Sequence, residues 1–219
     1  MIRCDAPSTP CPLCATVRPE LFHRDMRRDY FCCDICQLVF VPKQYFLSPT
    51  AEKARYDQHQ NSPDDVNYRR FLSRLCNPLM SRLAPGDRGL DFGCGPGPTL
   101  SRMLAEAGYP TAIYDPIYEP NADVWRDQYS FVVASEVVEH LHQPLTDLQR
   151  IWSVLKPAGW LGIMTKRLGH AAAFAEWHYK NDPTHVAFFA EATFIWLAAH
   201  WRAKLEVVGP DVVLLQKPF

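Results

Sequence analysis

The sequence lacks a charge excess of either sign and a long apolar run, and we expect no leader sequence in it. Its 219 residues include 23 Lys and Arg against 24 Asp and Glu, so the formal net charge is −1. Such a chain has no overall positive field to concentrate nucleic acid by counterion release. No segment approaches 18 uninterrupted apolar residues, and residues 1–7 lack the basic-then-apolar order of a signal peptide. We therefore expect a cytoplasmic protein with no membrane contact.

The composition also excludes disordered and fibrous chains. Hydrophobic residues make up 47% of the chain and charged residues 21%. That is enough apolar material for one substantial core and a small second unit, but not for two full domains. The chain is therefore expected to contain one main domain.

Cysteine, in contrast, is plentiful: the chain has eight, and five of them lie between residues 11 and 36. In a protein that is not exported, this crowding indicates a metal site rather than disulfides. Two Cys-x-x-Cys pairs, Cys11/Cys14 and Cys33/Cys36, are separated by 18 residues, which is the spacing of a four-thiolate zinc site. We expect a small zinc ribbon over residues 1–45. Its folding free energy would come from the metal, because the segment is too short to bury a core.

Two alternatives within this ligand set stay open. Cys32 can replace Cys33, and His23 can replace one thiolate, although paired Cys-x-x-Cys turns give the better geometry. The other three cysteines are read as unliganded: Cys4, Cys76 and Cys94.

Residues 46–85 are predicted to form a polar connector followed by a helix. Ser62 is the expected N-cap, and apolar residues recur at helical spacing as far as Leu83. Pro78 should kink this helix. Three connector residues either help to cover a ligand or, as we favour, are solvated: Tyr56, His59 and Asn61.

Strand and helix patterns alternate over residues 86–219, which predicts an α/β fold with a doubly wound, mostly parallel sheet. Residues 204–217 read as a hairpin that adds an antiparallel edge. The expected strands before it are residues 89–92, 111–114, 131–134 and 160–165, with helices after residue 98 and over 145–155.

A glycine-rich turn, DFGCGPG at residues 91–97, follows the first of these strands. The dinucleotide fingerprint fails because Pro98 stands where its third glycine belongs. The turn instead resembles the first motif of class I S-adenosylmethionine-dependent methyltransferases, and the resemblance extends over residues 88–219. It implies that Asp115 binds the ribose hydroxyls and that Asp91 orients the loop or meets the methionine amino group. The implied cofactor site is Asp91, Gly93, Cys94, Gly95, Gly97, Asp115, Ser135 and Glu136.

One departure from the family concerns its third strand. Only residues 116–128 separate Asp115 from the next predicted strand, too few for a strand plus a crossover helix. We expect that strand to be reduced or missing, which leaves about six strands. The family's adenine-binding residue then has no direct counterpart, and Asn121 or Asp123 is the candidate substitute.

The acceptor side is predicted from Glu136, Glu139 and His140, which share one face if residues 137–141 are helical. With the distant His185, they resemble the Glu-x-x-Glu-His pattern of metal-assisted O-methyltransferases, namely the ubiquinone-biosynthesis enzymes and the small-RNA 2′-O-methyltransferases. That resemblance implies a divalent cation at these four residues. The alternative, which we favour, is that the Glu-His pair only caps a helix or lines the cofactor pocket.

We expect His185, Glu139 and His140 to be the catalytic residues, with His185 as base or acceptor-binding group. Trp177 and Tyr179 are expected either in the core or facing the acceptor. Lys166 is read equally as an acceptor-side residue and as a solvated strand end.

Similar cysteine segments precede methyltransferase domains in bacterial small-molecule and glycan biosynthesis. The resemblance and the balanced charge favour O-methylation of a small-molecule or sugar-like acceptor. An RNA-modifying enzyme is the first alternative, with Arg24, Arg27 and Arg28 contacting phosphate, although Asp25 and Asp29 are interleaved. A non-catalytic cofactor-binding scaffold is the second.

Overall fold

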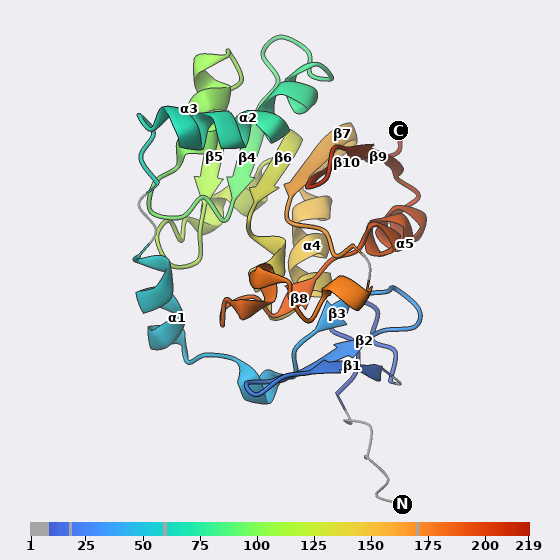
Figure 1. Ribbon diagram of the computed structural model, residues 1–219. Coiled ribbons are helices and arrows are strands. Elements are labelled where there is room, and N and C mark those ends of the chain that lie inside the picture. Colours follow the sequence, from blue (N-terminus) through green and yellow to red (C-terminus); the bar gives the residue numbers. More distant parts are fainter. Residues whose placement is uncertain (1–8, 18, 59–60, 170) are drawn as a thin grey trace, which may run out of the picture.

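The computed structural model describes residues 9–17, 19–58, 61–169 and 171–219 (Figure 1). Cys4, expected to be unliganded, and His59, a residue of the predicted connector, lie outside the described residues. Within the described ranges, no helix is both long and apolar enough to cross a membrane.

The larger unit is built on a six-stranded sheet, as the sequence predicted (Figure 1). Counted across the sheet, the first four strands run parallel to one another. The fifth runs antiparallel to both of its neighbours, the fourth and the sixth, which confirms the edge hairpin. In spatial order the strands are β5 (Thr111–Tyr114), β4 (Gly89–Phe92), β6 (Tyr129–Ser135), β7 (Leu155–Met164), β10 (Val212–Gln216) and β9 (Lys204–Val208).

Helices cover both faces of this sheet because successive strand residues point to opposite sides. Phe131 and Val133 of β6 pack in the cluster that holds α2 (Val66–Met80) and α3 (Thr99–Glu106). Val132 and Ala134 pack in the cluster that holds α4 (Pro144–Ser153) and α5 (Glu191–Trp201). The sheet is therefore the middle of three layers.

The expected loss of the family's third strand is confirmed. In the described part of the chain, β5 is the edge strand and pairs only with β4. The short link to β6 holds one 3₁₀ helix, η2 (Ala122–Arg126). That turn takes the place of a strand and a crossover helix.

The cysteine segment forms a second, smaller sheet that includes a strand from the larger unit. β1 (Glu20–Arg24), β2 (Asp29–Cys32) and β3 (Val39–Phe40) form an antiparallel meander. β3 also pairs with β8 (Ala187–Phe188), which comes from the segment between β7 and α5. Three 3₁₀ helices lie in the larger unit around that region: η3 (Val138–His140), η4 (Ala171–Ala173) and η5 (His178–Asn181).

Two expectations for the connector were wrong. Residues 43–61 hold η1 (Lys43–Tyr45) and a full helix, α1 (Pro49–Tyr56), whose first turn is capped by the Ser48 hydroxyl. The next helix begins at Val66, because Asp65 and not Ser62 accepts hydrogen bonds from the first free amides. It ends at Met80, two residues after Pro78.

Candidate active site

The glycine loop turns sharply between β4 and α3. Gly93 has a φ of 74°, and a side chain there would bring a Cβ atom within 2.5 Å of Val137. Only glycine combines that backbone conformation with that proximity. The loop is tied to β5, since the Gly93 amide donates to the Tyr114 carbonyl at 2.7 Å.

Asp91 lies under the loop rather than in the cavity above it. Its carboxylate accepts a hydrogen bond from the Ser101 amide at 3.1 Å, in the first turn of α3. Burial raises the pKa of Asp91 to about 7. Of the two roles considered for Asp91, this geometry favours holding the loop and helix in place.

Asp115 follows β5 and faces the cavity. One of its oxygens accepts from the amides of Ile117 and Tyr118 at 2.8 and 3.0 Å. The other accepts from the Gly95 amide at 3.1 Å. These bonds fix the carboxylate: the first oxygen already accepts two amides, and the second, which accepts one, keeps a lone pair for a ligand. This is the expected position for an acid that binds two neighbouring hydroxyls.

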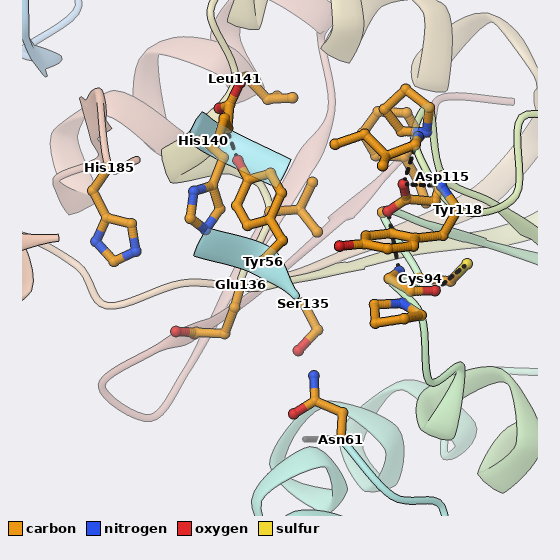
Figure 2. Close-up of a pocket in the computed structure, with 18 of the residues that line it drawn as sticks. Tyr56, Asn61, Cys94, Asp115, Tyr118, Ser135, Glu136, His140, Leu141 and His185 are labelled. Atoms are coloured by element: carbon orange, nitrogen blue, oxygen red, sulfur yellow. Dashed lines mark hydrogen bonds between the residues drawn. The ribbon is translucent and has the colours of Figure 1, made fainter. Parts of the chain in front are cut away.

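A cavity of about 610 Å³ opens at the carboxyl ends of β4, β5 and β6 (Figure 2). Its volume falls in the range of small-molecule sites. Figure 2 shows Asp115 and Cys94 on one side and His140 and His185 on the other, with Ser135 between them. The Ser135 hydroxyl oxygen is buried with no hydrogen-bond partner in the described part of the chain, so it can bond to a ligand.

The cavity is lined by most of the residues expected at the cofactor site. Asp91 is the buried exception, and Gly97 lies beside the cavity, against Asn61. Neither Asn121 nor Asp123 lines it: Asn121 caps η2, and Asp123 pairs with Arg126. The expected residues that do line it are Gly93, Cys94, Gly95, Asp115, Ser135 and Glu136.

Substitution of Gly97 is expected to disturb this cavity from the side. A Cβ atom at Gly97 would lie 2.1 Å from the Asn61 carbonyl oxygen, so Gly97→Ala must push the two segments apart. Overpacking of this kind costs about 1–3 kcal/mol, so we expect a lower melting temperature and about tenfold weaker S-adenosylhomocysteine binding. Calorimetry checks this, with Gly169→Ala as the control, because nothing lies within 4 Å of its added Cβ. Equal affinities for the two variants would contradict the account.

Glu136 is held in an unusual state at the end of β6. Its φ is 53°, a left-handed backbone conformation that residues other than glycine rarely adopt. Burial, reinforced by the nearby Glu139 and Asp211 charges, raises the pKa of Glu136 to about 8. The folded state therefore favours a protonated Glu136 at neutral pH.

This raised pKa predicts a pH-dependent gain in Glu136→Gln. Between about pH 4.5 and 8 the Glu136 carboxyl keeps its proton in the folded state and loses it in the unfolded state. The contribution of Glu136 to the free energy of unfolding therefore falls as the pH rises through this range. The neutral glutamine avoids that loss. At pH 8 we expect Glu136→Gln to melt about 3–6 °C above wild type, with no difference at pH 4.5. Thermal unfolding against pH checks this, and exposed Glu176→Gln should show no such trend.

Glu139 is completely buried beside the histidines. Its two oxygens accept hydrogen bonds from the hydroxyls of Thr165 and Tyr179. Burial raises the pKa of the Glu139 carboxyl. Tyr179 is thus buried and supports Glu139 from behind, and neither Tyr179 nor Trp177 lines the cavity.

His140 and His185 stack edge to face, with ring centroids 4.7 Å apart. The Nδ1 atom of His185 lies 2.7 Å from the Tyr179 carbonyl oxygen, and Nδ1 of His140 lies 3.2 Å from that of Thr184. A carbonyl only accepts, so Nδ1 carries the proton in both rings and Nε2 is the basic atom. Burial, with the neighbouring His140, lowers the pKa of His185 to about 4.

The expected four-residue cation set is only partly assembled. Ligand atoms of Glu139, His140 and His185 lie within 4.8 Å of one another, but Glu136 is not part of this group. The reason is local: residues 138–140 form a single 3₁₀ turn, and Glu136 precedes it in the left-handed conformation. The prediction that one α-helical face carries all three residues was therefore wrong.

Several cavity residues were not predicted as site residues. Glu52 reaches it from α1, and Asp182 reaches it from the loop before β8. Tyr56 and Asn61 also line it, so the favoured expectation that they are solvated connector residues was wrong. The Ser48-Pro49 pair, a cap followed by proline, was the signal that could have located α1. Lys166 is exposed, contacts His178 and does not line the cavity.

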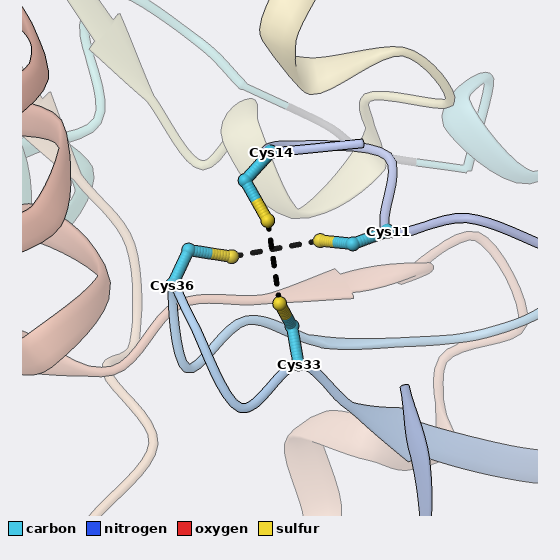
Figure 3. A group of neighbouring side chains, drawn as sticks. All are labelled: Cys11, Cys14, Cys33 and Cys36. Carbon is cyan, nitrogen blue, oxygen red and sulfur yellow. Dashed lines mark hydrogen bonds between the residues drawn. The ribbon is translucent and has the colours of Figure 1, made fainter. Parts of the chain in front are cut away.

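The four predicted zinc ligands meet at one point (Figure 3). Sγ atoms of Cys11 and Cys36 are 3.5 Å apart, and those of Cys14 and Cys33 are 3.3 Å apart. Four thiolates around zinc at about 2.3 Å are about 3.8 Å from one another, so the group needs little adjustment to hold the ion. Cys32 and His23 lie outside the group.

The two cysteine pairs also have the same backbone structure. In each, the amide four residues after the first cysteine donates to that cysteine's carbonyl, at 2.9 Å. That fourth residue, Ala15 or Gln37, has a φ near 60°. Without an ion, a hydrogen bond from the Cys36 thiol lowers the pKa of Cys11, while burial raises the pKa of Cys14. Zinc binding would therefore release the remaining thiol protons. These residues fit a structural zinc site.

Comparison with known proteins agrees with this geometry. Residues 67–208, more than half of the chain, match the methyltransferase domain family. No curated protein is a significant match.

Three solved structures share the fold at low sequence identity. An O-methyltransferase family protein from Burkholderia thailandensis has a TM-score of 0.52 and 12% identity, over 76% of this chain and 62% of that one. A Burkholderia thailandensis 1,6-didemethyltoxoflavin-N1-methyltransferase with bound S-adenosylhomocysteine has a TM-score of 0.50 and 16% identity, over 91% and 100%. An Archaeoglobus fulgidus SAM-dependent methyltransferase has a TM-score of 0.50 and 16% identity, over 67% and 93%.

At these identities the solved structures speak for the fold alone, and this chain spans only 62% of the first protein's length. The family match covers strands β4 to β9, the glycine loop and Asp115. The chain therefore belongs to the methyltransferase domain family and has the fold of the class I S-adenosylmethionine-dependent methyltransferases.

Proposed function

We propose that this S-adenosylmethionine-dependent methyltransferase methylates a hydroxyl oxygen of a small-molecule or sugar-like acceptor. The observation that carries the proposal is the single cavity, with Asp115 on one side and the His140/His185 pair on the other (Figure 2). One side suits the cofactor and the other suits a group that must lose a proton.

The cofactor side is assigned to the glycine loop, Asp115 and Ser135. When bound, S-adenosylmethionine supplies a methyl group on a sulfonium. Asp115 accepts hydrogen bonds from the ribose hydroxyls, and the buried Ser135 hydroxyl gains the partner it lacks. The 1,6-didemethyltoxoflavin-N1-methyltransferase, which shares the fold, holds S-adenosylhomocysteine.

Removal of the Asp115 carboxylate is expected to weaken cofactor binding strongly. Two hydrogen bonds to a charged group are worth about 3 kcal/mol together, so Asp115→Ala should raise the S-adenosylhomocysteine dissociation constant by about 100-fold. Isothermal titration measures this. The matched control is Asp123→Ala, an exposed carboxylate outside the cavity. Unchanged binding by Asp115→Ala would show that the ribose lies elsewhere.

The acceptor side is assigned to His185, Glu139 and His140. An acceptor hydroxyl must lose its proton during methyl transfer. His185 is neutral at physiological pH because its pKa is lowered to about 4, and its Nε2 atom is the one that takes the proton. The Glu139 carboxylate favours the charge that forms on His185, and His140 packs against the ring.

A second arrangement places a divalent cation at Glu139, His140 and His185. The ligand atoms within 4.8 Å favour it, and a cation there lowers the pKa of a bound hydroxyl. EDTA followed by added Mg²⁺ or Mn²⁺ separates the two arrangements, because only the second loses and then regains activity.

The ribbon is proposed to hold one structural zinc through Cys11, Cys14, Cys33 and Cys36. The RNA-modifying alternative loses support, because the Arg28 guanidinium is buried and bonded to backbone carbonyls, and Arg24 pairs with Asp29. Neither the Arg28 nor the Arg24 side chain is therefore arranged as part of a cationic row that faces phosphates.

The experiment that tests the proposal follows the methyl group. The purified protein is incubated with methyl-¹³C S-adenosylmethionine and a fractionated small-molecule extract, and the product is examined by NMR and mass spectrometry. An O-methyl carbon signal supports the proposal. An N-methyl or C-methyl signal, or label in RNA only, contradicts it.

A further inference from the structure

One arginine of the ribbon is bonded to the loop that carries His185. Arg28 lies between β1 and β2 and is 7% exposed. Its guanidinium donates to the His185 carbonyl at 2.9 Å and to the Asp182 carbonyl at 2.8 Å. It also donates to the carbonyls of Lys180 and Pro183. The five donors of the side chain therefore serve almost entirely to hold backbone more than 150 residues away.

A second contact joins the same two segments. The Lys180 ammonium donates to the Asp25 carboxylate at 2.8 Å, and Lys180 is buried. Asp25 also accepts from the amides of Arg27 and Arg28 at 2.8 and 3.0 Å. The turn between β1 and β2 is thus held rigid at the point where it meets the loop.

The loop transmits this contact to the cavity. The loop that carries His185 begins at Tyr179. The Tyr179 hydroxyl donates to the Glu139 carboxylate, and the Tyr179 carbonyl accepts from the His185 ring. The His185 amide donates to the Asp182 carbonyl at 3.2 Å, and that carbonyl also accepts from Arg28. Displacement of the loop would move His185 and the support of Glu139 together.

We infer that Arg28 is a positioning residue that lets the cysteine ribbon set the acceptor side of the active site. This inference rests on the proposed role of His185. Loss of the guanidinium takes a charged donor from four carbonyls of the loop, including the buried carbonyl of His185, and the loop must open to solvate them. The ribbon then acts as part of the methyltransferase site and not as a separate substrate-gripping module.

Three variants test the inference in the full-length, zinc-loaded protein. Arg28→Met keeps the apolar stem and removes every donor. Arg27→Met is the matched control, because Arg27 is the exposed neighbour on the same turn. Asp25→Asn keeps one oxygen for the Arg27 and Arg28 amides and weakens the bonds from Lys180 and the Tyr30 hydroxyl, so it reports on the loop if Arg28→Met does not fold. Zinc content is measured in each, to show that the ribbon is intact.

Hydrogen–deuterium exchange and S-adenosylhomocysteine titration are the readouts. For Arg28→Met we expect exchange at residues 179–188 to rise at least about tenfold, with exchange in β4 and β6 unchanged. Affinity for S-adenosylhomocysteine should stay within about threefold, because Cys94 and Asp115 lie across the cavity from His185 (Figure 2). With an acceptor identified by the methyl-labelling experiment, kcat should fall while KM for S-adenosylmethionine stays unchanged. Added methylguanidinium should restore part of the lost kcat.

Exchange at residues 179–188 that matches the Arg27→Met control would overturn the inference, as would a uniform rise across the whole sheet. For Asp25→Asn, a smaller rise confined to the same residues supports it, and no rise contradicts it. Failure of the wild-type protein to bind S-adenosylhomocysteine would instead overturn the proposed function and leave the loop measurement to decide on Arg28.

Discussion

Replacement of His185 by asparagine is expected to lower the rate of methyl transfer by about 10²–10⁴-fold, the usual contribution of a general base. Asparagine keeps a donor for the Tyr179 carbonyl, which Nδ1 of His185 contacts at 2.7 Å. It has no basic atom to replace Nε2. The loop should therefore keep its place while proton removal fails.

The measurement is kcat with the acceptor identified by the methyl-labelling experiment, together with S-adenosylhomocysteine affinity. Affinity should not change, because Asp115 lies on the other side of the cavity. His200→Asn is the control, since His200 is exposed on α5 and does not line the cavity. A rate for His185→Asn within threefold of that control would remove His185 from the chemistry.

The cofactor half of this site could be predicted because its information is local. Gly93, Gly95 and Asp115 lie in two short segments, and parallel strands bring their carboxyl ends to one edge. The same holds for the paired cysteines, where each turn is closed by its own backbone bonds. In both cases, a few residues of sequence determine where the side chains meet.

Loss of zinc is the second large effect that we expect. Apparent free energies of zinc binding to small structural sites are about 10–16 kcal/mol, so a ribbon without the ion should not fold. Cys33→Ser should reduce zinc from about one per chain to nearly none. Because β3 pairs with β8, the loss should also loosen residues 186–188 of the larger unit.

Elemental analysis and hydrogen–deuterium exchange check this, with Cys32→Ser as the control. Cys32 is the adjacent thiol, and its sulfur contacts the Cys33 carbonyl rather than the cluster. If Cys32→Ser loses zinc and Cys33→Ser keeps it, the ligand assignment is wrong. If both variants keep zinc, the zinc site depends on neither Cys32 nor Cys33.

The residues proposed for the acceptor half, Glu139, His140 and His185, were expected from the resemblance and do lie together, but the contacts that support them could not be predicted because they join distant segments. The Arg28 side chain meets carbonyls more than 150 residues later, and no local pattern encodes that contact. Glu136 does not join Glu139 and His140 because it has a left-handed backbone conformation and precedes a single 3₁₀ turn. The spacing of an α-helix does not apply there. α1 was missed because its surface is polar, with no buried residue to reveal a period.

A crystal structure of the protein with S-adenosylhomocysteine is the decisive experiment. In that structure we expect the ribose hydroxyls to bond to Asp115 and the sulfur to face the side of the cavity lined by His140 and His185. A ligand bound outside this cavity, or one whose sulfur points away from the two histidines, would contradict it.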